Sequence, residues 1–257
     1  MRQLRSLILS ASAAAALTTL AVSPYPQLEI KADRFFDQKE WAQAAATYDL
    51  MLDERPHIPA TYGRAIVSST MAGDTAAGIR LFSMALDNHV PFDSVFSRVR
   101  STSFELGRTD LYERLLLDIK KEHPWMRRTV NAYLLRYYAF RRDGRNMVAY
   151  ADIMLQGAPD NIGFLSTKAQ GQMLTGAQDA SVATYREILR LDPDNYPALL
   201  ELGNWYALDA LPGSPEAAMA ANYLGKAYSL RPTPHVAAIL NRLGYPPAAP
   251  ESKKQTR

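Results

Sequence analysis

Apolar side chains recur at fixed distances before a series of prolines along the chain. Spacings of three or four residues place such side chains on one face of an α-helix. No sustained two-residue alternation of apolar and polar residues appears, so the pattern predicts helices and no sheet. Five residues before each proline stand Met51, Leu86, Ile119, Met154, Ile188 and Ala227. Eight residues before stand Tyr48, Leu116, Ala151, Tyr185 and Leu224, with Phe82 one place out of register.

The prolines themselves form a ladder with a period near 34 residues, and glycines run in phase with it. Glycine can close a helix in the left-handed conformation, and proline prevents a helix from continuing. Each period therefore predicts a first helix, a glycine turn, a second helix and a proline turn, with helices of about 14 residues. The ladder consists of Pro56, Pro91, Pro124, Pro159, Pro193 and Pro232, with Gly73, Gly107, Gly144 and Gly176 between them.

The second helices of the first and fifth units, four periods apart, share a sequence pattern. They are "ATYDLMLDERP", which ends at Pro56, and "ATYREILRLDP", which ends at Pro193. The best first helix is "LLELGNWY" at residues 199–206. With Trp41, Ala44 and Tyr48 in the first unit, these residues resemble the tetratricopeptide repeat family. The resemblance covers residues 25–234 as about six degenerate units. The third and fourth lack most family residues in the first helix, and the sixth carries about five extra residues around "LDALPGSP".

The resemblance implies an all-α fold, a right-handed α-solenoid of stacked antiparallel helix pairs. A repeat domain is expected over residues 25–243, with a capping helix from Pro234 to Leu243. The segment 244–257 is typical of a disordered tail. In the family motif, Gly203 lies where the two helices of a pair approach closely, so a side chain there is expected to destabilise the fold.

The first 23 residues are typical of an export signal. Arg2 and Arg5 precede an apolar stretch over residues 7–22, which is short for a membrane span, and Ala21 and Ser23 supply small residues for cleavage. We therefore expect a periplasmic or exported protein. The alternative is an anchor formed by an uncleaved N-terminal segment. A lipoprotein is excluded because the chain has no cysteine, and no other stretch is long and apolar enough to span a bilayer.

The charge balance narrows the classes of partner that the chain is expected to bind. Two of the 29 basic residues lie in the first 23, so residues 24–257 carry 27 basic and 26 acidic residues. This near-neutral balance does not favour nucleic acid. The lack of cysteine also excludes disulfides, cysteine zinc sites and thiol nucleophiles. Protein or peptide partners are expected instead, and the oligomeric state is left open.

Motifs for catalysis, cofactors or metals are absent from the sequence: it has no Walker A motif, no G-x-G-x-x-G, no G-x-S-x-G and no H-E-x-x-H. We therefore expect no enzyme activity, no cofactor and no metal. The histidines could form a metal cluster at the solenoid edge, but consecutive turns are spread along the array, so polar turn residues are favoured. The four histidines are His57, His89, His123 and His235.

The most unusual segment is "WMRRTVNAYLLRYYAFRRDGR", residues 125–145, with six arginines and four Tyr or Phe residues. Arginine and tyrosine dominate protein-interface hot spots, and arginine with stacked aromatics also holds single-stranded nucleic acid. The favoured interpretation divides the segment into solvated arginines and core positions. Those core positions are Val130, Tyr133, Leu134 and Tyr137.

The resemblance further implies a ligand strip on the concave side of the first helices, with apolar anchors at Phe36 and Tyr138. The protein is thus expected to be a non-catalytic adaptor that binds a peptide or protein segment. A structural subunit using its convex face and ends is the alternative, and an enzyme with a cryptic site is a third. Exposed aromatic side chains in the groove would favour the adaptor. A large apolar patch elsewhere would favour the structural subunit. The expected strip comprises Asp33, Phe36, Asp37, Ser97, Ser101, Phe104, Arg128, Asn131, Tyr138, Gln170, Met173 and Asn204.

Overall fold

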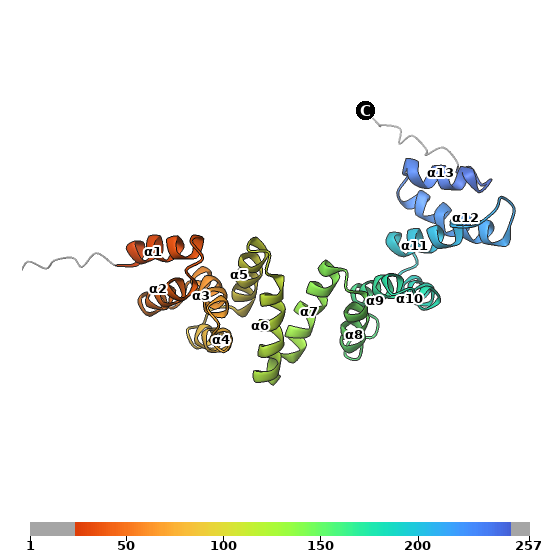
Figure 1. Cartoon of the computed structure of the whole chain (residues 1–257). Helices are drawn as coiled ribbons and strands as arrows, with labels where there is room; N and C mark the ends of the chain where they lie inside the picture. The colour runs from red at the N-terminus through yellow and green to blue at the C-terminus, as the bar shows by residue number, and fades with distance from the viewer. Residues whose placement is uncertain (1–23, 248–257) are drawn as a thin grey trace, which may run out of the picture. The chain divides into compact units, whose positions relative to one another are not determined.

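The computed structural model describes residues 24–247, and these residues are helical and contain no strand (Figure 1). The all-α class predicted from the apolar spacing is therefore confirmed. The expected export signal and most of the expected tail lie outside the described residues. The chain divides into an N-terminal unit, residues 1–107, and a C-terminal unit, residues 108–257.

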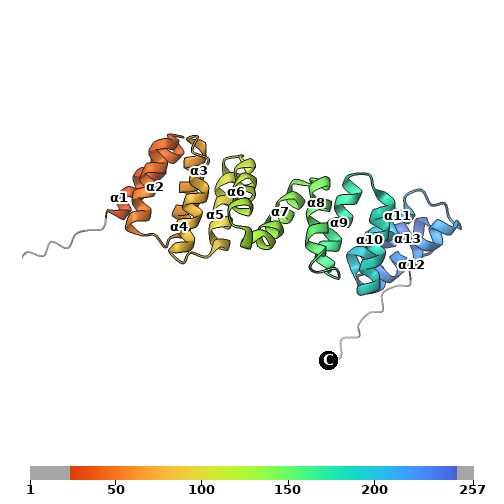
Figure 2. The same ribbon diagram turned by 90° about the horizontal axis from the view of Figure 1, so that it is seen from below.

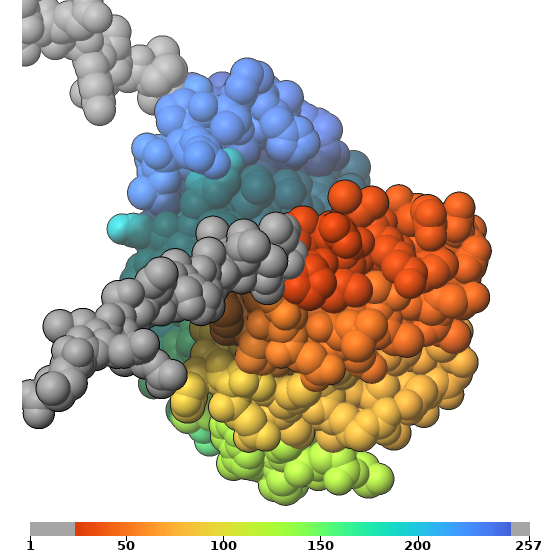
Figure 3. Space-filling view, turned by 90° about the vertical axis from the view of Figure 1, so that its left-hand side faces the viewer, coloured from red at the N-terminus to blue at the C-terminus, as the bar shows by residue number. Residues whose placement is uncertain are grey.

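The N-terminal unit is a stack of five helices, each packed on its neighbour along the chain, with α3 lying against both α4 and α5. In the space-filling view, α1 to α4 follow one another in chain order, from red to yellow (Figure 3). Large aromatic side chains fill the interior, and the rings of Phe82 and Phe96 stack 5.3 Å apart. The helices are α1 (Tyr25–Asp37), α2 (Trp41–Glu54), α3 (Pro59–Met71), α4 (Ala77–Asp87) and α5 (Phe92–Glu105).

The C-terminal unit is a second stack of helices, each packed on its neighbour along the chain (Figure 2). Its last helix covers the end of the stack, because Val236 and Leu240 pack into one buried cluster with Leu224 of the preceding helix. This helix, α13 (Pro234–Arg242), lies where the sequence predicts a capping helix. The helices are α6 (Thr109–Glu122), α7 (Arg127–Arg141), α8 (Gly144–Leu155), α9 (Ile162–Leu174), α10 (Gln178–Leu191), α11 (Tyr196–Ala207), α12 (Pro215–Leu230) and α13 (Pro234–Arg242), with a short 3₁₀ turn η1 (Pro124–Met126) before α7.

The turns follow the glycine and proline ladder with one exception. Second helices end two to four residues before each ladder proline. Gly73, Gly107 and Gly176 have positive φ values of 100°, 67° and 78°, a conformation that costs glycine little. The prediction that Gly144 forms the fourth such turn is wrong. Arg142 takes the left-handed conformation with φ 54° instead.

Gly144 is the first residue of α8, and close packing rather than turn geometry explains it. A Cβ atom on Gly144 would lie 2.8 Å from the carbonyl oxygen of Gly171 in α9, and one on Gly171 would lie 2.9 Å from the carbonyl oxygen of Gly144. Neither position has room for a side chain without moving backbone. The two glycines therefore let α8 and α9 approach closely.

Gly203 makes a similar approach, as expected from the family motif. A Cβ on this residue of α11 would lie 2.5 Å from Leu224 Cγ in α12, and Leu224 is fully buried. Gly225, one residue further along α12, has no atom within 4 Å of its Cβ position. The two glycines thus differ in the space around them.

We predict that Gly203→Ala lowers the free energy of unfolding by about 1–3 kcal/mol, because the added methyl group overpacks the α11–α12 contact. Gly225→Ala is the matched control and should be neutral or stabilising by up to about 1 kcal/mol, because alanine favours the helix. Urea denaturation followed by circular dichroism measures both. Equal effects of the two substitutions would contradict the close approach.

Candidate functional site

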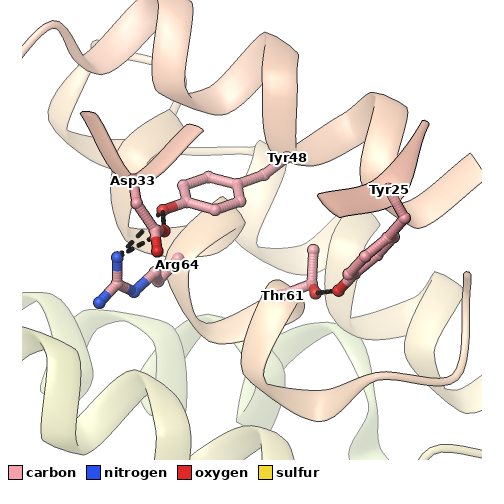
Figure 4. Close-up of polar contacts among 5 residues, drawn as sticks. All are labelled: Tyr25, Asp33, Tyr48, Thr61 and Arg64. Carbon is pink, nitrogen blue, oxygen red and sulfur yellow. Dashed lines mark hydrogen bonds and ion pairs between the residues drawn. The ribbon is translucent and has the colours of Figure 1, made fainter. Parts of the chain in front are cut away.

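In the N-terminal unit, Asp33 of the expected strip holds three helices together (Figure 4). The Tyr48 hydroxyl of α2 donates to Asp33 Oδ1 of α1 at 2.8 Å, and Arg64 Nη1 of α3 donates to the same oxygen at 2.7 Å. Burial raises the pKa of Tyr48, so its hydroxyl stays a donor. Asp33 therefore has a structural role in this unit.

Phe36 lies inside this unit and is only 6% exposed. Its ring meets the Trp41 ring edge-on at 5.3 Å, and the Arg64 guanidinium carbon lies 4.9 Å from its centroid. The expectation that Phe36 is an exposed anchor is therefore corrected: α2 and α3 cover it. The remaining strip residues of this unit are half-buried (Phe104) or exposed (Asp37, Ser97 and Ser101).

Tyr138 in the C-terminal unit is also buried, with 5% of its surface exposed. Its hydroxyl donates to Glu113 Oε1 of α6 at 2.7 Å, and its ring lies 5.2 Å from that of Tyr150 in α8. Burial, followed by this hydrogen bond, raises its pKa. The second expected anchor is therefore also corrected, because α6 and α8 enclose it. Gln170 and Met173 are exposed, and Asn204 is half-buried.

The structure brings two other strip residues, Arg128 and Asn131, together in an open hollow of about 350 Å³. We call it the α7–α8 hollow. The 3₁₀ turn η1 positions one wall, because Met126 is buried at 1% exposure while its neighbour Trp125 is 69% exposed. The hollow is lined by Pro124, Trp125, Arg127, Arg128, Asn131, Ile153, Met154 and Gly157.

The α7–α8 hollow combines apolar surface with unpaired positive charge. Within residues 24–247, neither Arg127 nor Arg128 forms an ion pair with another side chain, and no acidic residue lines the hollow. Asn131 is 4% exposed, and its Oδ1 atom has no hydrogen-bond partner there. An unpaired buried acceptor is costly. The hollow therefore offers a ligand apolar contact and two cations.

The arginine- and aromatic-rich segment divides largely as predicted. Val130, Leu134 and Tyr137 are buried, Tyr133 is half-buried, and all six arginines are exposed. Sequence reasoning did not find the contribution of Trp125 or of Ile153, which is 39% exposed on α8. The sequence signals for Trp125 were its place at the start of the arginine- and aromatic-rich segment and its position directly after a ladder proline.

A second open hollow, of about 450 Å³, lies in the N-terminal unit among α2, α3 and α4. Its rim carries Asp49, Asp53 and Asp74, with Arg80 paired to Asp74. Burial, and then the neighbouring Asp53, raises the pKa of Asp49. Among residues 24–247 no three His, Asp or Glu side chains group as metal ligands, and no helix there is long and apolar enough to cross a bilayer.

Comparison with known proteins gives structural similarity but no sequence match. No protein-family profile matches the chain, and no curated protein sequence matches it. A candidate protein-binding protein from Bacteroides ovatus aligns with TM-score 0.45 and 18% identity over 72% of this chain and 96% of its own. The C-terminal part of a TPR repeat-containing protein from Cytophaga hutchinsonii aligns with TM-score 0.45 and 13% identity, over 82% and 79%. The TPR2AB domain of yeast Sti1, in complex with pHSP90, aligns with TM-score 0.37 and 13% identity, over 86% and 99%.

Because of the buried tyrosines, the stability of the fold decreases as pH rises in the alkaline range. Burial raises the pKa of Tyr185 to about 12, whereas an unfolded tyrosine titrates near 10. The contribution of this hydroxyl to stability is therefore complete below about pH 10 and is lost as pH rises through about 12, a change of order 2–3 kcal/mol.

We predict that Tyr185→Phe flattens the fall of the thermal midpoint between about pH 10 and 12, because one proton fewer is released on unfolding. Tyr245→Phe is the matched control, since that side chain is 39% exposed near the end of the described chain. If the thermal midpoints of wild type and Tyr185→Phe fall in parallel over this pH range, burial does not keep the Tyr185 hydroxyl protonated.

Proposed function

We propose that the chain is an exported, non-catalytic adaptor that binds a segment of another protein. The observation that carries the proposal is the α7–α8 hollow, where exposed Trp125 lies beside Arg127 and Arg128 without ion-pair partners. Tryptophan and arginine are the side chains most enriched in interface hot spots. A large exposed aromatic ring next to unpaired cations is typical of a surface that a partner covers.

The repeat resemblance supports the same proposal. Within each unit, helix pairs of the tetratricopeptide kind would present their first helices to a ligand. Arg128 belongs both to the expected strip and to the α7–α8 hollow, so a ligand on the strip residues of the C-terminal unit would place an apolar side chain in the hollow. The strip residues that are exposed and free to take part are Asp37, Ser97, Ser101, Arg128, Gln170 and Met173.

A second candidate is a structural subunit that uses the second helices of the pairs. The observation that favours it is a set of exposed apolar side chains on those helices, which a soluble monomer gains nothing by exposing. They are Leu50 of α2, Leu117 of α6 and Met219 of α12, with exposures of 54%, 40% and 47%.

Photo-cross-linking in cell-envelope extracts distinguishes the two candidates. We predict that p-benzoylphenylalanine placed at Trp125 or Gln170 cross-links to a partner protein, and that placed at Leu50 or Met219 it does not. All four positions are exposed, so the reagent reaches solvent equally. Cross-links only from Leu50 and Met219 would favour the structural subunit. If the Arg127→Gln and Arg128→Gln variants capture the partner protein as well as wild type does, the hollow has no role in binding.

Export is tested separately. We predict that residues 1–23 fused to a reporter active only outside the cytoplasm confer activity, and that replacing Leu7, Ile8 and Leu9 by aspartate abolishes it, because an export signal needs an apolar core. Protease treatment of intact and opened cells measures the location. A reporter that stays in the cytoplasm with the intact segment would refute export, and a processed protein that remains in the membrane fraction would favour the anchor.

A further inference from the structure

The loop between α11 and α12, residues 208–214, presents two leucines to solvent. Leu208 is 66% exposed and Leu211 is 73% exposed, the latter sharing the highest exposure among the large apolar residues described. This loop holds the extra residues of the last helix pair, and it projects beyond the helices it joins (Figure 1). Large apolar side chains held outward in this way are typical of a docking surface.

The loop is held in place rather than merely exposed. Ala210, between the two leucines, is 7% exposed and packs into the buried cluster of α11, α12 and α13. Ser214 caps α12 by accepting a hydrogen bond from the Ala217 amide at 3.1 Å, and its own amide donates to the Leu211 carbonyl at 3.0 Å. The leucines are therefore presented on an ordered support, which lowers the entropy cost of docking.

Carboxylates without partners surround these leucines. Asp209 and Glu216 line an open hollow of about 480 Å³ at the loop, no basic residue lines it, and neither carboxylate forms an ion pair within residues 24–247. The remaining lining residues are Trp205, Tyr206, Leu208, Ala210, Leu211 and Ser214. A suitable occupant would offer cations next to apolar surface.

The same unit carries such a surface at the α7–α8 hollow. That hollow has exposed Trp125 and Ile153, unpaired Arg127 and Arg128, and no acidic lining residue. The loop is thus apolar and acidic where the hollow is apolar and basic. Complementary charge of this kind sets the register of an interface and excludes wrong partners.

From this complementarity we infer that the chain associates with itself, the α11–α12 loop of one copy docking on the α7–α8 hollow of the next. The two surfaces differ, so the contact is heterologous and each bound pair leaves one loop and one hollow free. A contact formed by one short loop is small, so the association is weak, with a dissociation constant between about 1 μM and 1 mM.

This inference rests on the proposed function in one respect: the partner protein and the second copy would use the same hollow. The two ligands therefore compete, and self-association regulates how much of the adaptor is open to its partner. A change in the loop should remove self-association and increase partner capture. A change in the hollow should reduce both.

Charge reversal followed by sedimentation velocity of the purified chain tests the inference. One variant carries Asp209→Arg and Glu216→Arg in the loop, and the other carries Arg127→Glu and Arg128→Glu in the hollow. Each alone should weaken self-association at least about tenfold, which is about 1.4 kcal/mol, because attraction becomes repulsion. An equimolar mixture of the two should restore it, since the basic loop of one fits the acidic hollow of the other.

The control is Arg136→Glu with Arg145→Glu, two exposed arginines outside the hollow, which should leave association unchanged. Wild-type association should also fall between about 0.1 M and 1 M salt, because exposed charges are screened. If the wild-type chain stays monomeric at the highest protein concentration measured, self-association is refuted and the adaptor proposal is unaffected. Association that survives both reversals, or a mixture that fails to associate when each variant is folded, overturns the assigned surfaces.

Discussion

Each helix in this protein depends on its neighbour to bury its apolar face, and that dependence governs the rest of the structure. Helices of this length are marginal in water by themselves. Helices approach closely at Gly63 with Arg98, at Gly144 with Gly171 and at Gly203 with Leu224, where an added side chain would not fit without a shift. The stack must end in a helix that buries the last face, and α13 does so through Val236 and Leu240.

The same dependence explains what the sequence could and could not predict. Periodic apolar residues and the proline and glycine ladder located the helices, because these features act within one helix or turn. Gly144 was misplaced because a turn glycine and a packing glycine look alike in sequence. Phe36 and Tyr138 were misplaced because their burial is decided by neighbouring helices, α2 and α3 for one and α6 and α8 for the other.

The candidate site was predictable only in part for a related reason. Arg128 and Asn131 lie one helical turn apart on α7, so the repeat register could place them together. Ile153 lies at the far end of α8, and only the folded helix pair brings it to Trp125 in the α7–α8 hollow. Side chains that maintain the fold fill the expected anchor positions, and the exposed aromatic surface lies at a turn instead. The site thus uses the part of the repeat that packing leaves free.

A partner protein that binds this chain should cover the α7–α8 hollow. Hydrogen–deuterium exchange of the chain with and without its cross-linked partner, isolated from the cell envelope, tests it most directly. Slower amide exchange on binding is expected over residues 124–131 and 153–157. Protection confined to the exposed faces of α2 and α12, with no change around Trp125, would contradict it.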